Sequence, residues 1–154
     1  MSVHSERAQE LFLRGYNCSQ AVFAAFCDKM DIDEETALRL SAGFGGGIAR
    51  QRETCGTLLG ATMVISYLFG PYDGGDYQSK NELYERVRAF FEAFREAQGA
   101  KSTVCRDLLG AHLIVGAEVG GYSAPRDADF YRKRPCLRII TSTAEMLDAF
   151  IERM

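Results

Sequence analysis

Apolar residues recur at helical spacing along most of the chain. Between Glu6 and Leu13, for example, Ala8, Leu11 and Phe12 fall on one face of a helix, with polar residues between them. Runs of β-branched residues, which are typical of strands, are scarce. The pattern therefore predicts an all-α protein.

The same periodicity predicts further helices, separated by glycines, prolines and short polar turns. They cover residues 17–30, 34–42, 54–69, 81–97, 103–109 and a last segment that Pro135 opens. We expect a single-domain helical bundle of about six or seven helices over residues 1–154, a length that usually makes one domain.

The segment from Gly110 to Arg134 does not follow this pattern. Its glycines and Pro125 indicate an extended loop. The apolar run Leu113-Ile114-Val115 could form a short strand, but the glycines and Pro125 favour the loop. The role of this segment stays open at the level of sequence.

Composition and charge exclude several classes of function. The 154 residues are 47% hydrophobic with a net charge of −3, which is too mild to attract nucleic acid or an anionic membrane. The longest apolar stretch, from Thr57 to Gly70, is shorter than the ~20 residues that cross a bilayer. The first residues do not resemble a signal peptide. We expect a cytoplasmic protein without a membrane or nucleic-acid partner.

Four of the five cysteines fall in the first turn of a predicted helix. Each follows a residue type that starts helices, and the four pairs are Asn17-Cys18, Thr54-Cys55, Thr103 with Cys105, and Pro135-Cys136. A helix N-terminus offers unpaired N–H groups and partial positive charge, which lower the pKa of a thiol. If the four helix starts meet, they make a site for negative sulfur.

Two chemistries suit such a site. Thiolates can ligate an iron–sulfur cluster or a zinc ion, or a pair of them can form a redox disulfide. Arg50, Arg52 and Arg106 lie near two of the cysteines in sequence and could add positive charge. The alternative is that the cysteines pack helix ends as small apolar residues. Cys27 lies in the middle of a predicted helix, and we assign it to packing.

A glycine run at residues 43–47 does not match the dinucleotide-binding motif, because Ile48 replaces the third glycine and no strand precedes it. The backbone at Gly45, Gly46 and Gly47 could instead hold a cofactor closely. His4 and His112 are the only histidines. We expect solvated or hydrogen-bonded roles for both and place His4 in a frayed terminus.

Taken together, five ordered motifs resemble the C_GCAxxG_C_C family, whose members are described as redox-active. They are Gly15-Tyr16-Asn17-Cys18-Ser19-Gln20-Ala21-Val22, Gly43-Phe44-Gly45-Gly46-Gly47-Ile48-Ala49-Arg50, Cys55-Gly56-Thr57-Leu58-Leu59-Gly60-Ala61, Cys105-Arg106-Asp107-Leu108-Leu109 and the late Cys136. The resemblance extends from about Gly15 to Leu147. It implies that Cys18, Cys55, Cys105 and Cys136 are the functional cysteines, whereas Thr57 replaces an alanine usual in the family.

The favoured hypothesis is a redox protein whose cysteines Cys18, Cys55, Cys105 and Cys136 bind a metal centre, above all an iron–sulfur cluster, with zinc as the alternative metal. A second hypothesis is a metal-free thiol–disulfide protein that uses Cys55 or Cys18 with another cysteine. A third is a structural or partner-binding helical module that holds zinc or no metal. The sequence identifies neither a redox partner nor an oligomeric state.

Overall fold

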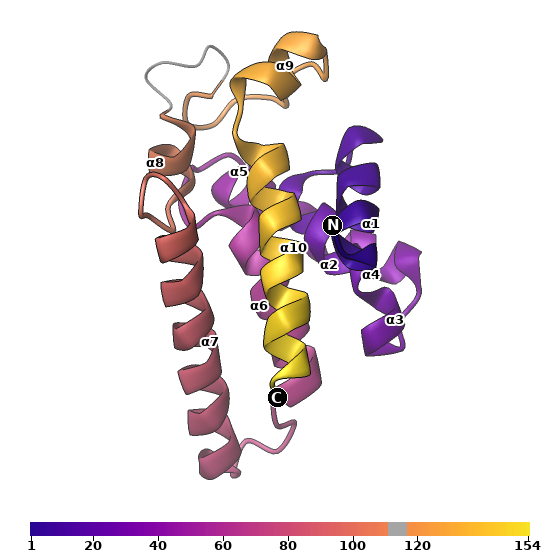
Figure 1. Cartoon of the computed structure of the whole chain (residues 1–154), viewed down its shortest axis with the longest axis vertical. Coiled ribbons are helices and arrows are strands. Elements are labelled where there is room, and N and C mark those ends of the chain that lie inside the picture. Colours follow the sequence, from indigo (N-terminus) through magenta and orange to yellow (C-terminus); the bar gives the residue numbers. More distant parts are fainter. Residues whose placement is uncertain (111–116) are drawn as a thin grey trace.

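The computed structural model describes residues 1–110 and 117–154, and within them the protein is helical, as predicted (Figure 1). The helices of eight residues or more are α1 (Val3–Leu13), α2 (Cys18–Ala25), α4 (Glu34–Ser41), α6 (Gly56–Phe69), α7 (Tyr77–Ala97) and α10 (Cys136–Glu152). Shorter ones are α3 (Cys27–Met30), η1 (Ala42–Phe44), α5 (Gly45–Ile48), α8 (Cys105–Leu109) and α9 (Ala128–Lys133).

The core lies where α1, α2, α6 and α10 pack against one another. Helices α6, α7 and α10 run side by side along the long axis, and α1 to α4 cover one flank (Figure 1). Burial of large apolar side chains such as Phe26, Ile65 and Leu147 stabilises this packing. None of the described helices combines the length and the apolar character needed to cross a membrane.

Capping explains where two helices begin earlier than predicted. Ser2 accepts a hydrogen bond from the Ser5 N–H, so α1 starts at Val3 and His4 is buried within it. The expectation of a frayed terminus at His4 was therefore wrong. Asp76 likewise accepts from the Ser79 N–H, so α7 starts at Tyr77 instead of residue 81.

Two further elements differ from the prediction. The helix predicted over residues 17–30 breaks at Phe26, so Cys27 opens α3 instead of lying in mid-helix. Helix α9 occupies part of the segment expected to be a loop, because Asp127 caps it by accepting from the Phe130 N–H. The short strand considered at Leu113-Ile114-Val115 lies outside the described residues.

A left-handed turn follows η1 and occupies α5 and the residues after it. Five consecutive residues have positive φ, namely Gly46 (68°), Gly47 (68°), Ile48 (66°), Ala49 (50°) and Arg50 (64°). Two of them are glycines, which adopt this conformation freely, whereas each of the others costs about 1–2 kcal/mol. Helix α6 begins at Gly56, shortly after this turn.

Candidate functional site: a cysteine-lined cavity

A cavity of about 390 Å³ opens at the end of the molecule where α2, α6, α8 and α10 begin. All four cysteines singled out from the sequence line it, namely Cys18, Cys55, Cys105 and Cys136. Each stands at a helix start, since three are first helical residues and Cys55 precedes Gly56 as the N-cap of α6. The structure therefore brings together residues that are far apart in the sequence.

Cys18 is fixed by the cap of α2. The Asn17 side chain accepts from the Gln20 N–H at 2.9 Å, and the Gln20 side chain accepts from the Asn17 N–H at 3.0 Å. Asn17 also donates to the Ala42 carbonyl at 2.8 Å, which ties α2 to the start of the glycine run. This capping box sets the position from which Cys18 enters the cavity.

Cys55 and Cys105 are positioned by a short pairing of two extended segments. An isolated antiparallel bridge joins Thr54 to Val104. The Cys55 N–H donates to the Thr103 carbonyl at 2.8 Å, and the Cys105 N–H donates to the Glu53 carbonyl at 2.6 Å. The backbone thus holds these two cysteines on neighbouring segments before either helix begins.

Glycines make room for two of the sulfur-bearing side chains. A Cβ added at Gly56 would lie 2.5 Å from the Cys18 Sγ, and one at Gly47 would lie 2.7 Å from the Cys105 Cβ. Both approaches are closer than any side chain tolerates. Gly45 and Gly46 line the cavity, whereas Gly47 packs behind Cys105.

The prediction that helix starts lower the thiol pKa values is wrong for three of the four cysteines. Burial raises the pKa of Cys55 and of Cys105, and the neighbouring Cys18 raises both further, whereas Arg52 opposes the increase in the pKa of Cys105. Burial, followed by Cys18 and Cys105, raises the pKa of Cys136 to about 12. Loss of water around the sulfur and repulsion between thiolates outweigh the helix ends, so these three thiols are protonated at neutral pH.

Arginines surround the sulfur atoms. Arg52 is 1% exposed and its Nη1 donates to the Cys105 Sγ at 3.7 Å. Arg50, Arg126 and Arg134 also line the cavity. Of the arginines proposed from the sequence, Arg50 and Arg52 reach the cavity, whereas Arg106 is exposed and does not line it. Sequence reasoning missed Arg134, although it directly precedes Pro135 and Cys136.

The remaining candidates lie elsewhere. Cys27 does not line the cavity and packs against the core, in line with the packing role predicted for it. His4 Nδ1 lies 2.6 Å from an Asp148 oxygen and its Nε2 lies 3.0 Å from an Asp28 oxygen. His4 thus ties α1 to α3 and α10 and has the hydrogen-bonded role expected. His112 lies outside the described residues.

Within the part of the chain that the structure describes, no three His, Cys, Asp or Glu side chains approach closely enough to hold one metal ion. A single zinc ion needs four ligands at about 2.0–2.3 Å around one point. The cavity cysteines share a wall, but they do not form that tetrahedron.

The comparison with known families agrees with the motifs. The family described as "Putative redox-active protein (C_GCAxxG_C_C)" matches residues 16–150. The chain belongs to this family. Neither a curated protein nor a solved structure matches it.

Membership in the C_GCAxxG_C_C family indicates a redox-active protein. The match covers Cys18, Cys55, Cys105 and Cys136, the same four cysteines that meet at the cavity. Thr57, the departure from the family pattern, is buried beside them, and its side chain acts to lower the raised pKa of Cys55.

Proposed function

We propose that the protein transfers electrons through an iron–sulfur cluster held by Cys18, Cys55, Cys105 and Cys136. The observation that carries this proposal is the convergence of all four motif cysteines on the wall of one cavity. When bound, such a cluster accepts and releases single electrons, and the protein tunes its potential by charge, hydrogen bonds and burial.

The donor set suits this cofactor. Iron–sulfur clusters are held by four cysteine thiolates, and the cavity supplies four. Several iron and sulfide ions lie between those ligands, so the cysteines stand farther apart than around a single ion. A multinuclear centre therefore demands less close spacing of the cysteines than one zinc ion does.

The surrounding residues suit a negatively charged centre. Arg52 donates to the Cys105 sulfur, a contact of the kind that raises the reduction potential of a thiolate-bound cluster. Gly56 and Gly47 leave the Cys18 and Cys105 side chains unobstructed. Phe12, Leu109 and Ile139 add apolar wall that limits access of water.

Anaerobic purification of the untagged protein tests the proposal. We expect a brown protein with stoichiometric iron and sulfide, and loss of both in Cys18→Ser and Cys136→Ser. Cys27→Ser is the matched control, because this cysteine lies outside the cavity, and it should keep the colour. A colourless wild-type protein that takes up neither iron nor sulfide on anaerobic reconstitution overturns the proposal.

A metal-free thiol–disulfide protein is the second candidate. It is favoured by the four free thiols at one cavity and by the guanidinium of Arg52 beside one of them. It predicts one reversible disulfide between Cys55 and another cavity cysteine. Mass spectrometry of peptides from oxidised and reduced protein, together with metal analysis of the same sample, distinguishes the two candidates.

A further inference from the structure

Arg52 is a buried cation with an unused donor. Its side chain is 1% exposed, and its Nη1 donates to the Cys105 Sγ. The Nη2 is also buried and finds no acceptor in residues 1–110 or 117–154. A buried N–H of a charged group is normally paired, so an unpaired one facing a cavity points to a missing acceptor.

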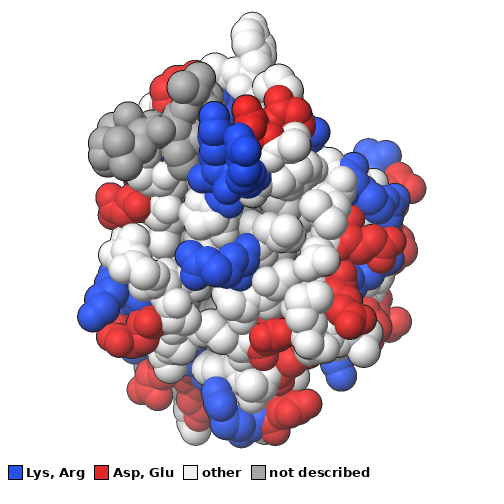
Figure 2. All heavy atoms as spheres, turned by 45° about the horizontal axis from the view of Figure 1, so that its top comes forward, with Lys and Arg blue, Asp and Glu red and all other residues white. Residues whose placement is uncertain are grey.

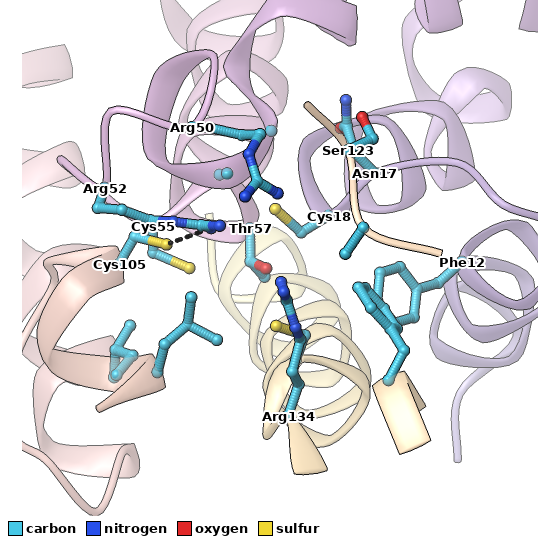
Figure 3. A pocket seen from close by; sticks show the side chains of 18 of the residues that line it. Phe12, Asn17, Cys18, Arg50, Arg52, Cys55, Thr57, Cys105, Ser123 and Arg134 are labelled. Carbon is cyan, nitrogen blue, oxygen red and sulfur yellow. Dashed lines mark hydrogen bonds between the residues drawn. The ribbon is translucent and has the colours of Figure 1, made fainter. Parts of the chain in front are cut away.

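Two more guanidinium groups face the same space. Figure 3 shows Arg50, Arg52 and Arg134 pointing into the cavity from three sides, around Cys18 and Thr57. Arg50 is oriented by donation from its Nε to the Gly120 carbonyl at 2.8 Å, and Arg134 lies 4.4 Å over the Phe130 ring. Burial lowers the pKa of Arg134, and Arg52 and Arg50 lower it further, so the three cations repel one another.

Basic side chains outnumber acidic ones along the part of the cavity wall that the structure describes. Among the described residues that line the cavity there are four arginines and neither an aspartate nor a glutamate. Glu118 is the carboxylate that acts on Arg50, and it lies outside the lining. The face turned forward in Figure 2 shows basic side chains within a largely uncharged central area, with most acidic ones toward the edges.

We propose that the cavity is a binding site for a small oxyanion, held by Arg52 together with Arg50 and Arg134. Guanidinium groups pair with phosphate, sulfate and carboxylate groups through two parallel N–H donors, and the anion supplies the acceptor that the Arg52 Nη2 lacks. The proposal deepens the proposed function by naming the substrate class of the same cavity. That the oxyanion is a redox substrate rests on the proposed function, whereas the binding of the oxyanion does not.

The dimensions of the cavity agree with this ligand class. Its volume of about 390 Å³ lies within the range of small-molecule sites, so an anionic group with a short organic remainder fits. Arg126 is not part of the proposed anion contact. It donates to the carbonyls of Phe12 and Tyr16 and stacks on the Phe12 ring, which gives it a structural role.

Titration calorimetry on reduced, metal-free protein tests the site, with sodium sulfate as the free oxyanion and glycerol 3-phosphate as an organic one, both at constant ionic strength. We expect saturable binding of at least one of them. Tighter binding of glycerol 3-phosphate supports an organic ligand, and equal affinities support a free anion.

Variants locate the site. Arg52→Met and Arg134→Gln should each weaken binding at least tenfold. Arg39→Gln is the matched control, because that arginine pairs with Glu35 on the surface and is 79% exposed. If Arg52→Met does not fold, as judged by circular dichroism, Arg134→Gln decides. Absence of saturable binding in the wild type, or equal weakening by Arg39→Gln, overturns the inference.

The same titration on protein reconstituted with iron and sulfide separates this inference from the proposed function. Anion binding without iron uptake removes the cluster and leaves the oxyanion site. Iron uptake without anion binding, in both the metal-free and the reconstituted protein, removes the oxyanion site and leaves the cluster. The arginines then interact with the sulfur atoms alone.

Discussion

The surroundings of the two ends of α6 contribute differently to the stability of the fold. Toward its C-terminal half, Ile65 is fully buried in the core, where side chains are well packed and the backbone is regular. At its N-terminus, Cys55 and Gly56 border a cavity, a buried arginine and a left-handed turn. The second region contains backbone strain and a buried Arg52 donor without an acceptor among the described residues, and neither stabilises the fold, a combination typical of functional sites.

The largest expected effect belongs to the core. Ile65→Ala removes apolar contacts from a fully buried position and leaves a void, so the free energy of unfolding should fall by about 2–5 kcal/mol. Urea unfolding followed by circular dichroism measures this change. Iron content per folded molecule should stay the same, and a loss of iron from folded Ile65→Ala would contradict the separation of the two regions.

A smaller effect on stability, with a larger effect on the site, is expected of Gly56→Ala. The new methyl group would lie 2.5 Å from the Cys18 Sγ and 2.7 Å from the Phe44 carbonyl oxygen, so overpacking should cost about 1–3 kcal/mol and displace Cys18. Gly74→Ala is the control, since a Cβ there meets no atom within 4 Å. Urea unfolding and metal analysis of both variants check the prediction, and equal behaviour would contradict it.

The pH dependence of stability should reveal the buried thiols. An unfolded thiol has a pKa near ~8.5, whereas burial raises that of Cys136 to about 12. Above pH ~9 the unfolded chain therefore binds fewer protons than the folded one, and stability falls by about 1.4 kcal/mol per pH unit for each such thiol, up to the folded pKa.

Unfolding of reduced, metal-free protein by urea at several pH values between 8 and 11 measures this slope. Cys136→Ser should reduce the slope by the contribution of one thiol. Lysines and tyrosines titrate in the same range in both proteins, so the difference between the two slopes excludes their contribution. Identical slopes in the two proteins would show that Cys136 ionises as readily when folded as when unfolded.

The smallest expected effect concerns the left-handed turn. Ala49→Gly places at φ 50° a residue that adopts this conformation without strain, and should stabilise the protein by about 1 kcal/mol. The matched control, Ala93→Gly on the exposed side of α7, should destabilise it by about 1 kcal/mol. Thermal unfolding of the pair shows the contrast, and destabilisation by both would mean that the turn is not strained.

Helical periodicity and caps predicted most elements because their causes are local. The start of α4 after Asp33 and the end of α7 near Ala97 follow from the adjacent residues. The break at Phe26 and the left-handed run from Gly46 to Arg50 were not predicted. Positive φ at Ile48 contradicts the propensity of a β-branched residue, so residue type could not predict it.

The sequence predicted which cysteines form the candidate site, but it did not predict the burial and charge of their surroundings. The positions of Cys18, Cys55, Cys105 and Cys136 at helix starts follow from the sequence. Their raised pKa values do not, because burial and repulsion between sulfurs depend on tertiary structure. The position of Arg134 at the cavity likewise could not be predicted, because it depends on the start of α10 lying beside α6.

The distribution of the cavity cysteines along the chain also constrains the order of events during folding. Cys18 and Cys136 lie near opposite ends of the sequence, and the other two come from separate segments between them. Contacts between such distant segments form late, because closing long loops costs entropy before any contact compensates for it. A ligand that needs all four sulfurs is therefore acquired after synthesis and collapse of the whole chain, so loading of the site reports on completed folding.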